Sequence, residues 1–142
     1  MESIFILSPA ETMTLDQVKT LAESQGYRGY KHKLKSKDLI TLVYDEGEIR
    51  GKEIWPTYQI DLEAERRAGF LEGVSAFNER ELAELEKLGI RSCIQIDCHL
   101  EAIPSMRSLL RAILENWGGF VIYEDLDVRY SKDELMDFNP HY

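Results

Sequence analysis

Three carboxylates crowd one short segment near the end of the chain, where residues 118–135 read GGFVIYEDLDVRYSKDEL. Glu124, Asp125 and Asp127 lie there within four positions. Two carboxylates can perform acid–base chemistry when their environments separate their pKa values, and three can bind Mg²⁺ or Ca²⁺ when their oxygens converge. Neighbouring strand residues point to opposite faces, however, and the segment lacks the D-x-D-x-D-G ladder of a calcium site. The spacing therefore favours solvent-exposed acids or a partner-binding surface over a catalytic or metal site.

Asp97, Cys98 and His99 form a second polar group, which includes three types of metal ligand. Adjacent strand residues diverge, and the chain holds no CxxC, HxxxH or HExxH motif that would complete a zinc site. Asp97 and His99 fall on the more polar face of a strand predicted at residues 91–100. We predict that this pair belongs to a binding surface. The alternative is a small enzyme or ligand-binding domain with its polar site near Asp97 and His99.

The two cysteines, Cys93 and Cys98, lie five positions apart on the same predicted strand and so face opposite sides. Two cysteines are too few for a disulfide framework, and we expect reduced, mostly buried thiols. The strand is expected to place Ile94, Ile96 and Cys98 on its core face and Cys93, Gln95, Asp97 and His99 on its other face.

Other catalytic motifs are missing from the sequence. The segment GVSAF at 73–77 resembles a nucleophile elbow but lacks the second glycine and does not follow a strand. Neither GxGxxG nor GxxxxGK[ST], the loops that bind nucleotide phosphates, occurs. The sequence therefore predicts no catalytic residue, no cofactor and no metal ligand, which indicates a protein that is not an enzyme.

The charge of the chain is strongly acidic and uneven. There are 17 Lys and Arg residues against 26 Asp and Glu, a net of −9. Residues 1–60 hold eight basic and nine acidic residues, whereas residues 61–142 hold nine and seventeen, which gives nets of −1 and −8. The acidic half, residues 61–142, is expected to repel nucleic acid and anionic membrane and to attract basic partners, although an acidic charge can also serve solubility alone.

One basic segment, YRGYKHKLKSKD at 27–38, interrupts this pattern. Basic and aromatic side chains together can bind phosphates and stack on bases. Alternating lysines also protect the edge strand of a sheet from pairing with another molecule. Because the whole chain is acidic, we favour an edge guard or a rim of charge over a nucleic-acid site.

The length of 142 residues suits one domain, 1–142. No apolar run is long enough to span a membrane, and the N-terminus lacks the basic start of a signal peptide, so we expect a cytoplasmic protein. The main elements are predicted in the order β-α-β-β-α-β-α-β-α, an α+β domain whose helices pack on a mainly antiparallel sheet. Strands are expected at 3–8, 37–48, 52–60, 91–100 and 120–124, with Pro56 indicating that 52–60 lies at an edge or carries a bulge. Helices are expected at 15–25, 79–88, 105–117 and from 132 onward, with a weaker helical pattern at 61–73.

The C-terminal third, about residues 91–137, combines an alternating strand, a well-formed helix and the acidic segment NWGGFVIYEDLDVRYSKDEL. In this it resembles the small cytosolic immunity proteins of bacterial contact-dependent growth inhibition and polymorphic toxin systems. The resemblance implies a non-enzymatic inhibitor that binds one cognate toxin domain, often a basic nuclease. It implies contact residues at Glu124, Asp125, Asp127 and Asp133. To these the acidic helix adds Glu79, Glu84 and Glu86, and the polar pair adds Asp97 and His99 as further candidate contacts.

Overall fold

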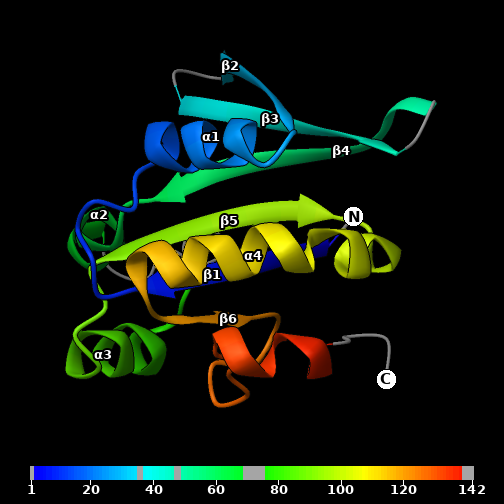
Figure 1. Ribbon diagram of the computed structural model, residues 1–142. Helices are drawn as coiled ribbons and strands as arrows, with labels where there is room; N and C mark the ends of the chain where they lie inside the picture. The colour runs from blue at the N-terminus through cyan, green and yellow to red at the C-terminus, as the bar shows by residue number, and fades with distance from the viewer. Residues whose placement is uncertain (1, 35–36, 47–48, 69–75, 139–142) are drawn as a thin grey trace.

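The strands form one open sheet with the order β2-β3-β4-β5-β1-β6, as the computed structural model shows (Figure 1). The structure describes residues 2–34, 37–46, 49–68 and 76–138. Every pair of neighbouring strands runs antiparallel, which confirms the α+β class. The strands are β1 (Glu2–Ser8), β2 (Arg28–Leu34), β3 (Lys37–Glu46), β4 (Ile49–Ile60), β5 (Ser92–Cys98) and β6 (Phe120–Ile122). The helices are α1 (Leu15–Ser24), α2 (Leu62–Ala68), α3 (Glu79–Lys87) and α4 (Ile103–Trp117), with 3-10 helices η1 (Leu100–Ala102) and η2 (Lys132–Asp137). Among the described residues, no helix is long and apolar enough to cross a membrane.

The order of elements differs from the prediction by the strand β2 and by the helix α2, which forms over part of the weaker helical pattern at 61–73. Strand β2 is the basic stretch of the sequence, and it lies at the edge of the sheet, where it pairs only with β3. Two further boundaries are corrected. The last strand ends at Ile122 instead of continuing to Glu124, and the terminal helix is a 3-10 helix. The turn between β3 and β4 lies outside the described residues, as do residues 69–73 of the weaker helical pattern.

The edge position that Pro56 indicated for β4 is wrong, because β4 lies between β3 and β5. The bulge alternative holds for the strand but not at Pro56, since the irregular pairing of β3 with β4 lies between Tyr44 and Glu46. The pairing of β4 with β5 runs from Thr57 to Ile60 and so begins directly beside the proline. A residue without an N–H is tolerated where the hydrogen-bond ladder on one side stops.

Helices cover both faces of the sheet. Helices α1 and α4 lie across one face (Figure 1). Helices α2 and α3 lie at one end of the molecule, where they cover the other face. Ile94, Ile96 and Cys98 pack into the core under α1 and α4, as predicted. Cys93 was expected on the more exposed face, but it is fully buried in a second core beneath α2 and α3. The strand alternation was therefore correct, and the error lay in treating that face as uncovered.

A capping box fixes the start of α3. The Glu81 amide donates to Asn78 Oδ1 over 2.8 Å, and the Asn78 amide donates to Glu81 Oε1 over 3.0 Å. The helix then buries Leu82 and Leu85 in the second core. The position and angle of α3 therefore depend on the cap formed by Asn78 as well as on the two buried leucines.

Replacing this cap should weaken the protein measurably. We expect Asn78→Ala to lower the free energy of unfolding by about 1 kcal/mol, because the first turn loses an acceptor for its free N–H groups. Urea unfolding followed by circular dichroism measures the loss. Asn78→Ser keeps an acceptor and should lose much less, and an equal loss in both variants would contradict the capping role.

Candidate partner-binding surface

The acidic segment after β6 is a tight turn and not the continuation of a strand. Asp125 Oδ1 accepts a hydrogen bond from the Asp127 amide over 2.9 Å, and the Val128 amide donates to the Asp125 carbonyl oxygen over 3.0 Å. Between these residues Leu126 is completely buried in the second core. The turn is thus anchored by one apolar side chain, and Glu124, Asp125 and Asp127 are exposed around it.

Two ion pairs place this turn beside α3. Arg129 Nη2 lies 3.3 Å from Glu84 Oε1, and Arg80 Nη1 lies 3.8 Å from Asp127 Oδ2. Arg129 also donates to the Leu126 carbonyl oxygen and lies over the ring of Phe120. The ion pair of Arg129 with Glu84 joins segments that lie 45 residues apart in the sequence. We use the name acidic surface for the carboxylates of the turn and of α3 together: Glu79, Glu84, Glu86, Glu124, Asp125 and Asp127. Of the α3 residues, Glu84 pairs with Arg129, whereas Glu79 and Glu86 line a hollow beside Arg66.

Members of the acidic surface differ in how free their carboxylates are. Glu79 and Glu86 are exposed, and no ion pair engages them within the described part of the chain. The Asp125 carboxylate accepts a hydrogen bond within its own turn, and the Glu84 carboxylate forms an ion pair with Arg129. Glu124 lies close to Tyr123, whose hydroxyl donates to Glu2 Oε2 over 2.8 Å. The pKa of Tyr123 is raised mainly by this hydrogen bond, and further by partial desolvation and by the charge of Glu124.

Asp133 belongs to a different part of the molecule. It lies in η2, which packs against α4. Leu135 of η2 and Phe138, which follows η2, belong to the first core, the one under α1 and α4, whereas α3 covers the second core. The start of η2 is fixed by Ser131, whose amide and hydroxyl donate to Glu134 Oε1. These bonds lower the pKa of Glu134. Asp133 itself is exposed, on an element that packs on the opposite side of the sheet from α3.

The polar pair of β5 is also separate from the acidic surface. Asp97 Oδ1 accepts hydrogen bonds from Ser3 Oγ over 2.6 Å and from Gln95 Nε2 over 2.9 Å. His99 is exposed beyond the end of the strand, where it precedes η1. Within the described ranges, no hydrogen bond or ion pair joins either residue to α3 or to the acidic turn, and no group of three or more His, Cys, Asp or Glu could hold a metal ion.

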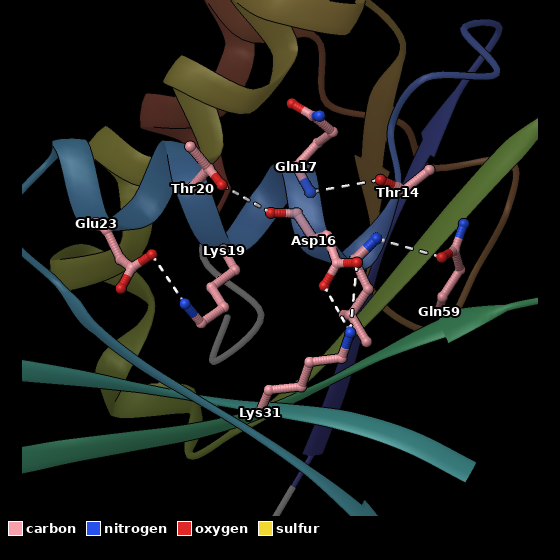
Figure 2. Close-up of polar contacts among 9 residues, drawn as sticks. Thr14, Asp16, Gln17, Lys19, Thr20, Glu23, Lys31 and Gln59 are labelled. Carbon is pink, nitrogen blue, oxygen red and sulfur yellow. Dashed lines mark hydrogen bonds and ion pairs between the residues drawn. The ribbon is translucent and has the colours of Figure 1, made fainter.

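The basic segment of β2 is partly neutralised by α1, as Figure 2 shows. Lys31 Nζ lies 3.0 Å from Asp16 Oδ1, and Lys19 Nζ lies 3.0 Å from Glu23 Oε1 within α1. The hydrogen bond to Asp16 raises the pKa of Lys31. The segment lies at the sheet edge, where an edge guard belongs, and part of its charge is already paired.

Both thiols are buried, on opposite faces of β5. Burial, reinforced by the charge of Glu65, raises the pKa of Cys93 well above its usual value. A thiolate is the reactive form, so we expect neither Cys93 nor Cys98 to react with Ellman's reagent in the native protein and both to react in urea. Rapid modification of either thiol before unfolding would contradict this burial.

Sequence reasoning missed a polar cleft where β4 leads into α2 and β5 begins. Its charged lining comes from Glu11, Asp61, Glu63, Arg66 and Arg91. These residues belong to three segments that are far apart in the chain, and none of them forms a motif. Only the strand order β4-β5-β1 brings the segments together.

Comparisons of the chain with models of known protein families, with curated proteins and with solved structures found no match.

Proposed function

We propose that the protein is a non-enzymatic cytoplasmic inhibitor, an immunity protein that binds and neutralises a cognate basic toxin domain such as a nuclease. The observation that carries the proposal is the pairing of α3 with the acidic turn through Arg80–Asp127 and Arg129–Glu84. It turns two separate acidic segments into one surface. The resemblance of the C-terminal third to immunity proteins supports the same function.

The physical basis is electrostatic complementarity. The acidic surface lies in the half of the chain with a net charge of −8, and complementary fields raise association rates by orders of magnitude. Nuclease domains bind phosphate groups with basic side chains. Clustered carboxylates on a fixed scaffold can form ion pairs with these basic side chains in place of the phosphates.

Rigidity of the acidic turn supports a binding role. Leu126 is anchored in the second core, and the turn is closed by Asp125. A preorganised surface loses little conformational freedom when it binds, so more of the interaction free energy appears as affinity.

The experiment begins with the neighbouring reading frame: where it encodes a large secreted protein, the C-terminal domain of that protein is co-expressed with this chain. The proposal predicts a 1:1 complex, protection of the host cells from that domain, and inhibition that rises in proportion to inhibitor until the two are equimolar. Inhibition by far less than equimolar protein would indicate catalysis instead. A domain that forms no complex and is not inhibited would overturn the proposal.

A further inference from the structure

The polar cleft is large enough for part of another chain. Its volume is about 490 Å³, within the range of sites that hold small ligands. Ile60, Leu62 and Ile90 supply apolar lining, and Glu11, Asp61 and Glu63 supply carboxylates. Glu11 is already paired with Arg91, whereas no ion pair engages Asp61 or Glu63 within the described part of the chain.

A second hollow of about 230 Å³ lies against α3, where Glu79, Leu82 and Glu86 line it. Arg66 lines both the cleft and the hollow, so the two lie on either side of one side chain. We call them together the α2–α3 groove. Its described lining carries five carboxylates and two guanidinium groups, a net of −3. Hollows lined mainly by one sign of charge concentrate the field and attract the opposite charge.

Arg66 gives a second indication of what the groove holds. Its Nε is buried and has no hydrogen-bond partner among the described residues, and a buried donor left unpaired costs free energy. A main-chain carbonyl brought into the groove offers the acceptor that Arg66 lacks, after a small shift of its side chain. An extended peptide carries such carbonyls at every residue, and basic side chains on it would reach carboxylates on both sides of Arg66.

We infer that the α2–α3 groove receives an extended segment of the partner that carries lysine or arginine side chains. This inference rests on the proposed function, because it specifies how the basic partner is recognised. It adds Asp61 and Glu63 to the contact residues, and it links the cleft to Glu79 and Glu86 of the acidic surface.

The test uses the full chain and the peptide acetyl-Ala-Lys-Ala-Lys-Ala-Lys-Ala-amide, with glutamate replacing lysine in a control peptide. Binding is followed at low ionic strength by NMR, through the amide signals of Ala64 and Ala83. The groove variant is E63Q/E86Q. The matched control is E101Q/D137N, which removes the same charge from exposed positions on η1 and η2.

We expect the lysine peptide alone to shift both alanine signals and to bind 1:1. Its dissociation constant should rise about three- to tenfold in the groove variant, as for the loss of two exposed ion pairs, and stay unchanged in the control. Shifts confined to 124–128 would overturn the groove while leaving the acidic surface as the proposed binding site. Equal weakening in both variants, or no binding, would also overturn it. Failure of the toxin domain to form a complex would count against the proposed function instead.

Discussion

Gly119→Ala is expected to be among the most destabilising single substitutions in this protein. A Cβ atom built at Gly119 would lie 1.9 Å from the Leu7 carbonyl oxygen and 2.9 Å from Ser8 Cα. Both neighbours belong to the backbone of β1, which pairs on either side with β5 and β6 and cannot shift alone. The φ of +105° adds a conformation that side chains other than glycine rarely adopt.

The expected loss is about 2–5 kcal/mol in the free energy of unfolding, from a left-handed backbone at about 1–2 and overpacking at about 1–3. Urea unfolding provides the measurement. Gly89→Ala is the matched control, because its φ is +74° and nothing lies within 4 Å of the added Cβ. We expect the control to lose about 1–2 kcal/mol. Equal losses in the two variants would show that contact with β1 is unimportant.

Neutralising the acidic surface should have the largest effect on function. We expect E79Q/E124Q/D127N to lower the rate of association with the proposed toxin domain about ten- to a hundredfold at low salt, because the proposal assigns these charges the role of steering the encounter. Asp125 is left intact, since its carboxylate closes the turn. The pair of Asp127 with Arg80 is mostly exposed, so breaking it should change stability little.

The control for this variant is E101Q/D38N/D137N, which removes three charges from exposed positions on η1, β3 and η2. Stopped-flow mixing measures both association rates over a range of salt. The acidic-surface variant should also lose most of the salt dependence that the wild type shows. Equal slowing by the control would mean that only net charge matters, which would contradict a localised surface.

Local patterns predicted the elements whose sequence signals agree with their burial. The apolar stripe of α4 places Met106, Leu109 and Ile113 in the first core, and the capping box of Asn78 begins α3 as predicted. The strand β2 was missed as an element because its sequence alternates lysines with other residues that do not form an apolar face. Its pairing is supplied by β3, a contact that the local pattern of residues 28–34 does not contain.

The candidate surface was predictable only in part. Sequence spacing identified the acids of the turn and of α3, but not that Arg129 joins Glu84 or that Leu126 anchors the turn. Those contacts depend on where β6 and α3 lie in the folded chain. For the same reason Asp97, His99 and Asp133 were grouped with a surface to which the structure does not join them.

Hydrogen exchange of the complex tests the central claim most directly. We predict that binding of the toxin domain slows amide exchange in two segments together, 79–86 in α3 and 123–129 in the acidic turn. The exposed edge strand β2, residues 28–34, serves as the internal reference and should exchange as in the free protein. Slowed exchange at β2, with α3 and the acidic turn unchanged, would contradict the account.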